Sequence, residues 1–298
     1  MGNTWTLADI RNKVRQVTGR YSTNDLSNTQ LDEYINRYYL YTFPAEVKLE
    51  QKHTYYEFQT IANQPTYNAP DSLYTNYEPP ATVNNLSMLW YQNPAKFNNE
   101  NPLQYVFSTP WTGDGATVTF TTTVQSFPIY PSTLTISDNT ETFEDTTTTY
   151  TTSDITITGD AGGTATINYS TGAVSVTFSA APADGQDIYL NYVQFQPNRP
   201  QAILYYNNQF QLFPVPDQVY IIKMLAYQTV TALTNATDTP DLNEWGPCIA
   251  YGASRDIFTD YGETDAYAET TALYKEQVSY VLTRTEQDLL NVRAMPNF

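Results

Sequence analysis

Cysteine and histidine are almost absent from this chain of 298 residues, which has one of each, Cys248 and His53. A single cysteine excludes an intrachain disulfide and fits synthesis in a reducing cytosol. A single histidine excludes two-histidine metal sites such as the zincin motif. A Cys248–His53 nucleophilic pair is formally possible. Cys248 falls within an apolar helical pattern, however, where a lone cysteine is usually inert packing, so we expect no catalytic role.

Basic residues and long apolar runs are also scarce. The chain has 14 Lys and Arg against 31 Asp and Glu, for a net charge of −17. Binding to a phosphate backbone needs clustered cations, so specific nucleic-acid binding is not expected. An acidic wall past which DNA slides is compatible with this charge, as is a role in solubility alone. No apolar run approaches the roughly 18 residues of a membrane span, and the first twenty residues lack a signal-peptide pattern.

The usual catalytic motifs are missing as well. No P-loop, nucleophile elbow or dinucleotide fingerprint occurs, and the glycine-rich run 159–163 lacks the required Lys and a following helix. Carboxylates cluster in one Thr-rich stretch, and paired carboxylates can serve a glycosidase or bind Ca²⁺. The spacing fits no known calcium loop, and solvated turn residues are the plainer interpretation. We therefore predict no enzyme activity, no catalytic residues and no cofactor. The cluster comprises Asp138, Asn139, Glu141, Glu144 and Asp145.

Tyrosine is abundant, with 26 residues in a chain that is 14% aromatic and 41% hydrophobic. This composition provides ample material for folded cores. Tyrosine combines a large contact area with a polar tip and suits wet protein–protein interfaces. It is equally common on half-buried strands. Composition leaves both interpretations open.

Composition divides the chain into three parts: 1–104, 105–197 and 198–298. The middle part, from Tyr105 to Pro197, has no Lys or Arg and nine acids, for a net charge of −9. Its alternating Thr, Val and Ile residues predict several short strands, with a hairpin loop at Ser170–Gly172, and so a β-sandwich. Because compact units of this kind tolerate insertion, we expect it to interrupt a host domain.

The first part opens with helical patterns. Apolar spacing from Leu7 to Val17 predicts a helix that Thr6 caps and Gly19 ends. A second pattern, from Leu31 to Tyr38, predicts another helix that stops at Pro44. A strand is expected near residues 55–61. The Pro/Asn/Tyr-rich stretch 64–101 is expected to form long loops and isolated strands.

The last part begins with strands and ends with helices. Residues 202–206 and 209–213 flank a two-residue turn at Asn207-Asn208, and residues 219–227 predict a further strand. Helical spacing follows from Trp245 to Ile257 and from Tyr267 to Leu282. Helices at both ends of the chain suggest a shared core. The predicted fold class is therefore α+β, with a helical-bundle core built from both chain ends and an inserted antiparallel β-sandwich.

Several motifs give the chain a family resemblance. Residues 159–178 are similar to a β module common in phage structural proteins. The C-terminal third, together with the N-terminal helix pair, resembles head-to-tail adaptor (connector) proteins of tailed bacteriophages, the short-tailed type especially. The large β insertion and the stretch 64–101 depart from compact adaptors. The motifs that carry the resemblance are Phe210–Asp217, Tyr220, Ala232–Thr234, Asp238–Pro240, Trp245, Tyr261-Gly262 and Ile35–Tyr38.

The resemblance implies a structural virion protein at the head–tail junction, synthesised in the host cytoplasm. Such adaptors form a homo-oligomeric ring, usually a dodecamer that matches the phage portal protein. The ring lines a channel through which genome DNA passes without sequence-specific binding. It also offers a platform for downstream tail or fibre proteins. The resemblance further implies a C-terminal portal-binding arm, whose candidate residues are Asn291, Val292, Arg293, Met295 and Phe298; a frayed terminus is the alternative.

Two other functions remain open. The chain is alternatively another tail or fibre-attachment component, with the β-sandwich as its working part, although fibre repeats and coiled-coil heptads are not visible. A third, less favoured alternative is a carbohydrate-binding or glycan-hydrolysing virion surface protein. In that case we expect Trp90 and Trp111 to be exposed and to stack on sugars.

Overall fold

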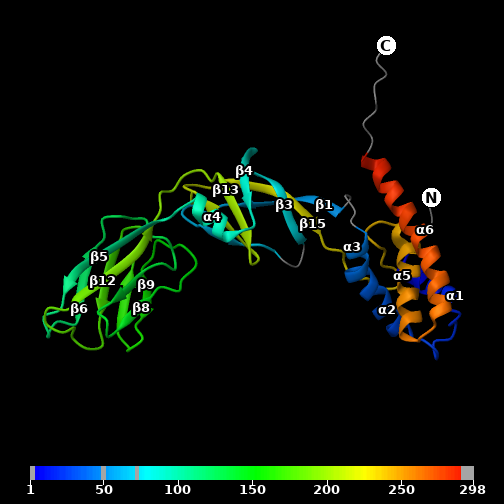
Figure 1. Cartoon of the computed structure of the whole chain (residues 1–298), viewed down its shortest axis with the longest axis horizontal. Coiled ribbons are helices and arrows are strands. Elements are labelled where there is room, and N and C mark those ends of the chain that lie inside the picture. Colours follow the sequence, from blue (N-terminus) through cyan, green and yellow to red (C-terminus); the bar gives the residue numbers. More distant parts are fainter. Residues whose placement is uncertain (1–3, 48–51, 71–73, 290–298) are drawn as a thin grey trace, which may run out of the picture. The chain divides into compact units, whose positions relative to one another are not determined.

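A computed structural model of the chain describes residues 4–47, 52–70 and 74–289 (Figure 1). The chain separates into two compact units. The first comprises Met1–Thr54, Ser72–Asn76 and Tyr227–Phe298, and the second comprises Tyr55–Asp71 and Tyr77–Ala226.

The structure contains a seven-stranded sheet and two four-stranded sheets, so β-structure dominates. The predicted fold, a helical-bundle core with an inserted sandwich, is therefore wrong. The segments 1–104 and 198–298, assigned to that core, supply all strands of the seven-stranded sheet. Their pairing joins strands far apart in the chain, and local periodicity does not reveal such pairing.

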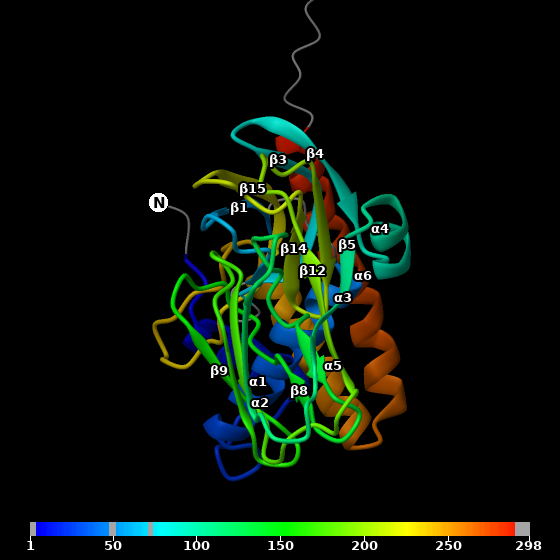
Figure 2. The same cartoon turned by 90° about the vertical axis from the view of Figure 1, so that its left-hand side faces the viewer.

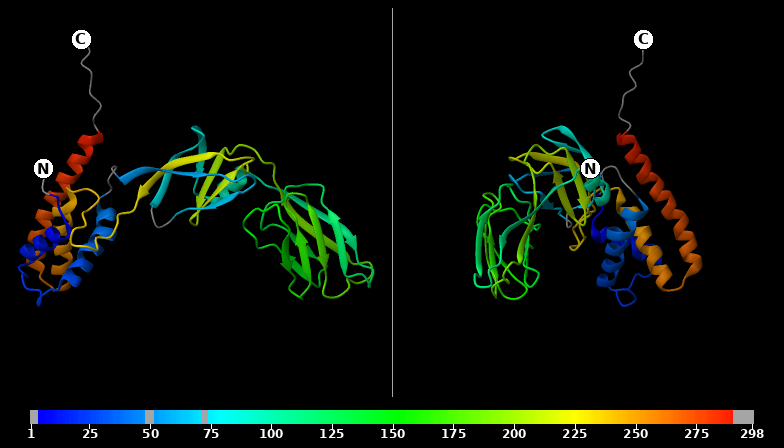
Figure 3. Two further views of the ribbon diagram at one scale, coloured as in Figure 1. Left: turned by 180° about the vertical axis from the view of Figure 1, so that it is seen from behind. Right: turned by 60° about the vertical axis from the view of Figure 1, so that its left-hand side comes forward.

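The helices of the first unit come from both ends of the chain and share one hydrophobic core (Figures 1 and 3). Leu7, Ile35, Trp245 and Ile257 are all fully buried in it. The elements are α1 (Leu7–Thr18), α2 (Asn28–Arg37), the π-helical turn η1 (Tyr38–Thr42), α3 (Phe43–Glu46), α5 (Trp245–Asp260) and α6 (Thr264–Leu289).

The ends of α1 follow the predicted signals. Thr6 and Asp9 form a capping box at its start, and Gly19 adopts the left-handed conformation just after its end, with φ of 68°. The predicted stop at Pro44 is wrong. Pro44 lies near the start of α3, which follows directly on η1 and α2, so the helical run continues past Pro44 to Glu46.

Two glycines allow aromatic rings to pack directly on the backbone of α5. A Cβ atom on Gly252 would lie 2.1 Å from the Tyr38 ring, and one on Gly246 would lie 2.4 Å from the Trp5 ring. Side chains at these positions would displace the N-terminal segments from α5.

The seven-stranded sheet has the order β1-β15-β3-β4-β13-β14-β2. β4 and β13 pair in parallel, and β3 and β4 form an antiparallel hairpin through Asn84-Asn85. The stretch 64–101, expected to form long loops and isolated strands, supplies three strands that pair within the sheet and a short helix. The elements are β1 (His53–Gln59), β2 (Thr66–Asn68), β3 (Tyr74–Val83), β4 (Leu86–Tyr91), α4 (Pro94–Glu100), β13 (Ala202–Tyr206), β14 (Gln209–Phe213) and β15 (Ile221–Gln228).

Two four-stranded antiparallel sheets, β5-β12-β7-β8 and β6-β11-β10-β9, pack face to face (Figure 2). Alternate side chains from both sheets fill one apolar core, including Ile136, Phe143, Val176 and Leu190. The strands are β5 (Gln104–Thr112), β6 (Thr119–Thr123), β7 (Thr135–Ser137), β8 (Thr142–Glu144), β9 (Ile155–Thr158), β10 (Thr164–Ile167), β11 (Ala173–Thr177) and β12 (Asp187–Gln194). We call this part the sandwich.

Both predicted hairpins are confirmed. β10 and β11 pair across the loop at Ser170–Gly172, where Gly172 has φ of 71°. β13 and β14 pair across Asn207 and Asn208, whose φ angles of 50° and 55° fit the turn that matches strand twist.

Candidate interaction sites

The predicted portal-binding arm, with Asn291, Val292, Arg293, Met295 and Phe298, lies outside the described residues. The candidate sites below are therefore surfaces and contacts of the two compact units.

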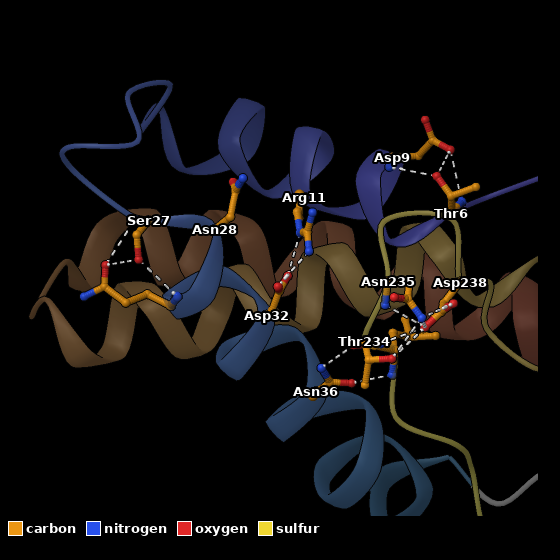
Figure 4. A network of polar contacts seen from close by, with 12 residues as sticks. Thr6, Asp9, Arg11, Ser27, Asn28, Asp32, Asn36, Thr234, Asn235 and Asp238 are labelled. Atoms are coloured by element: carbon orange, nitrogen blue, oxygen red, sulfur yellow. Dashed lines mark hydrogen bonds and ion pairs between the residues drawn. The ribbon is translucent and has the colours of Figure 1, made fainter.

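Two of the motifs that carry the adaptor resemblance, Ile35–Tyr38 and Ala232–Thr234, meet in the first unit. The Asn36 amide on α2 donates to the backbone carbonyl of Leu233 and accepts from its N–H, both at 2.8 Å (Figure 4). This pair of bonds, which we call the Asn36 clamp, joins positions 197 residues apart. It fixes the segment before α5 against the N-terminal helices.

The segment 234–238 also caps α1. Its Asp238 carboxylate accepts from the N–H groups of Thr234 and Asn235, each at 2.8 Å (Figure 4). The carbonyl of Asp238 then accepts from Leu7 N–H at 2.7 Å. Free N–H groups at a helix start need acceptors, so this segment is part of the N-terminal capping of α1. Sequence spacing gives no sign of these contacts.

A polar chain crosses the helical core. The Tyr38 hydroxyl donates to the Tyr274 hydroxyl at 2.8 Å, and Tyr274 donates to Glu46. Arg255 pairs with the same Glu46 carboxylate at 3.5 Å. Cys248 is fully buried beside this chain, and burial raises the pKa of its thiol to about 12. A raised pKa favours the protonated thiol near neutral pH, which is the less nucleophilic form.

Helix α6 exposes two apolar side chains near a hollow, with the exposed Glu276, which accepts from the Tyr280 hydroxyl, between them. Leu273 and Tyr280 are 45% and 54% exposed and lie two helical turns apart on one side. Tyr280 also borders a hollow of about 510 Å³. We call the two residues and the hollow the α6 surface. The hollow is lined by Trp5, Asn243, Glu244, Pro247, Gln277, Tyr280, Val281 and Thr283.

The carboxylate cluster of the sandwich is largely internal. Asp138, Glu141 and Asp145 are each at least 95% buried, whereas Glu144 and Asn139 are exposed. The Glu141 carboxylate accepts from Gly163 N–H at 2.5 Å and from Ser179 N–H at 2.7 Å. These contacts join separate loops of the sandwich.

Asp138 and Asp145 make similar contacts with protein donors. Asp145 accepts from Ser132 N–H and from the Tyr169 hydroxyl, at 2.8 and 2.7 Å. Burial alone would raise the pKa of Asp138, but hydrogen bonds from Glu141 N–H and Thr140 outweigh it and lower that pKa. Among the described residues, no group of three or more His, Cys, Asp or Glu side chains is arranged to hold a metal ion.

The two tryptophans expected to face sugars are half-buried instead. Trp111 packs against the sandwich core and donates to the carbonyl of Thr121 at 3.1 Å. The two most exposed aromatic residues of the sandwich were missed by sequence reasoning. They are Tyr105 and Phe107 on β5, 67% and 74% exposed, whose rings stack 6.3 Å apart. Their alternation with half-buried Val106 was the available signal.

No known family model matches the chain, and no curated protein matches it. Among the described residues, no helix has both the length and the apolar character needed to cross a membrane.

Proposed function

We propose that the chain is a structural subunit of the head–tail junction of a tailed phage, which assembles into a ring between portal and tail. Two features support this proposal. Two of the motifs that resemble adaptor proteins, Ile35–Tyr38 and Ala232–Thr234, meet at the Asn36 clamp in a unit built from both chain ends, whereas Phe210–Asp217 and Tyr220 lie in the second unit. The same unit exposes Leu273 and Tyr280 on α6, near a hollow that Tyr280 borders, and these side chains are available for contact with a neighbouring subunit.

The α6 surface is the feature that best supports assembly into a ring. A ring requires this surface to contact a different surface of the neighbouring subunit, because contact with its own counterpart would close a two-fold dimer. Such a heterologous contact generates a closed ring when the rotation between neighbours closes. Burial of Leu273 and Tyr280 by a neighbour removes apolar area from water and stabilises the assembly.

The proposed mechanism is mechanical rather than chemical. The ring docks on the portal, continues its channel and presents a platform to tail components. The net charge of −17 suits a channel through which DNA moves, because the acidic protein repels the DNA phosphates. The proposal assigns no catalytic residue and no cofactor.

Electron microscopy of the purified full-length chain, alone and mixed with the portal protein of the same phage, tests this function. We expect closed rings that bind one end of the portal, with twelve-fold symmetry. A chain that stays monomeric at high concentration and leaves the portal bare would contradict the proposal.

The second candidate is another tail or fibre-attachment component, and the exposed aromatic pair on β5 favours it. In that case the sandwich binds its partner but the first unit forms no ring. The same microscopy separates the two, because only the adaptor forms a closed ring on the portal.

A further inference from the structure

Three aromatic side chains form an exposed patch on one face of the sandwich. Tyr105 and Phe107 point outward from β5, and Tyr189 on β12 is 40% exposed. Phe107 pairs with Asn191, two residues from Tyr189 on the same face of the sheet. We call these three residues the β5 patch. Exposed aromatic rings gathered in this way are typical of binding surfaces.

β5 is also an edge strand. The sheet order is β5-β12-β7-β8, so β5 has a hydrogen-bonded neighbour on one side only. It spans nine residues, whereas the opposite edge strand, β8, spans three. Proteins usually protect long edges with charged side chains, proline or bulges. Here Pro110 and a register shift protect one end, but the stretch from Gln104 to Thr109 contains no charge.

The loops at the C-terminal end of β5 are acidic. Asp114, Asp184 and Asp187 are exposed, and backbone bonds of Gly113 with Gln186 and Gly185 hold their loops together at the far end of β5. Hydrogen bonds from Thr117 and Ala116 lower the pKa of Asp114 to about 2, so this carboxylate stays ionised. Since residues 105–197 contain no Lys or Arg, no cation of the sandwich balances these charges.

We propose that the edge of β5 binds an extended basic segment of another protein, which adds an antiparallel strand to the sheet. Main-chain hydrogen bonds along Gln104–Thr109 provide the pairing, and aromatic faces at Tyr105 and Phe107 receive Arg or Lys side chains as cation–π partners. The acidic loops attract the same segment over longer range. An acidic segment or a second copy of this sandwich fits less well, because like charges repel.

This inference deepens the proposed function, since it gives the chemistry of the tail component held by the sandwich. The test uses the full-length chain and a peptide of about seven residues that alternates arginine and valine, compared with one that alternates glutamate and valine. Fluorescence anisotropy measures binding, and hydrogen–deuterium exchange locates it. We expect binding of the basic peptide only, weakening as salt rises, with slowed exchange in residues 104–109.

The variants Phe107→Ser and Tyr105→Ser should each weaken binding about threefold, and Asp187→Asn should weaken it at low salt only. Tyr206→Ser removes an equally exposed tyrosine on β13, outside the sandwich, and should change nothing. The inference would be overturned if the basic peptide failed to bind or if both peptides bound equally. Slowed hydrogen exchange at a site other than β5 would also overturn it. Ring formation on the portal does not enter this assay, so the two proposals can fail separately.

Discussion

At the scale of single residues, buried carboxylates of the sandwich act as acceptors for backbone N–H groups that lie outside the strand ladders. Glu141 is the clearest example, because it joins the loop at Gly163 to the chain at Ser179 after β11. Acidic residues in a Thr-rich stretch suggested solvent or a metal, but their oxygens accept from the protein itself.

Glu141→Gln should therefore destabilise the sandwich by about 2 kcal/mol, since an amide keeps the shape but replaces one acceptor oxygen with a donor. Hydrogen–deuterium exchange of the full-length chain should show faster exchange in residues 159–163 and 177–180. Glu144→Gln, at an exposed position nearby, is the matched control and should leave exchange unchanged. Equal exchange in both variants would show that Glu141 is not a structural acceptor.

The lowered pKa of Asp138 predicts that the stability of the turn between β7 and β8 depends on pH. Because its folded-state pKa is lowered, the stability it contributes is present above the unfolded value of about 4 and is lost as pH falls through the folded value. Exchange in residues 138–142, corrected for the intrinsic rate, should therefore increase below about pH 4. Asp138→Asn should flatten this dependence, whereas Asp184→Asn should retain it. A turn equally protected at pH 2.5 and pH 6 would contradict the role of this carboxylate.

At the scale of elements, helix ends and hairpin turns could be predicted from nearby residues, whereas pairing between strands distant in the sequence could not. Thr6 and Gly19 mark the ends of α1, and Asn207-Asn208 marks a hairpin, because each signal lies next to the backbone it shapes. β3 has no comparable signal. It contains Pro79-Pro80 and lies between β15 and β4 in the sheet, and β15 is more than 130 residues away. Only tertiary pairing makes such a segment a strand.

The candidate sites follow the same rule. The Asn36 clamp was invisible in the sequence because its partner is a backbone group 197 residues away. The exposed aromatic pair on β5 was detectable in principle, since the pattern Tyr-Val-Phe places its two rings on one side of a strand. Which side faces solvent depends on the second sheet of the sandwich, and so on tertiary packing.

Loss of the Asn36 clamp should loosen one segment of the first unit. Asn36→Asp keeps the size but removes the donor to the Leu233 carbonyl, so it should cost about 2 kcal/mol. Exchange in residues 230–240 and at the start of α1 should accelerate, because the same segment caps α1. Asn12→Asp makes an identical change at an exposed position of α1 and serves as control. If residues 230–240 exchange equally in both variants, the clamp does not hold this segment.

At the scale of the whole molecule, the helices from both chain ends form one unit and most strands another. In the proposed function, the first unit forms the ring and the sandwich, within the second unit, binds a partner. A change on the α6 surface should affect assembly of the chain with itself, whereas a change on β5 should affect what the sandwich binds. The two surfaces therefore allow independent tests on one full-length protein.

Leu273→Glu should prevent ring formation and leave the subunit folded. The side chain is already 45% exposed, so a charge there costs little in the monomer, but a neighbour would have to bury it without a partner. Analytical ultracentrifugation should show monomers at concentrations where the unaltered chain forms rings, with an unchanged circular dichroism spectrum. Ser279→Glu adds the same charge to another exposed side of α6 and should leave assembly intact. Rings that persist in Leu273→Glu would exclude Leu273 from the subunit contact. The free-energy cost of burying an unpaired carboxylate exceeds the stabilisation from the apolar contact that it replaces.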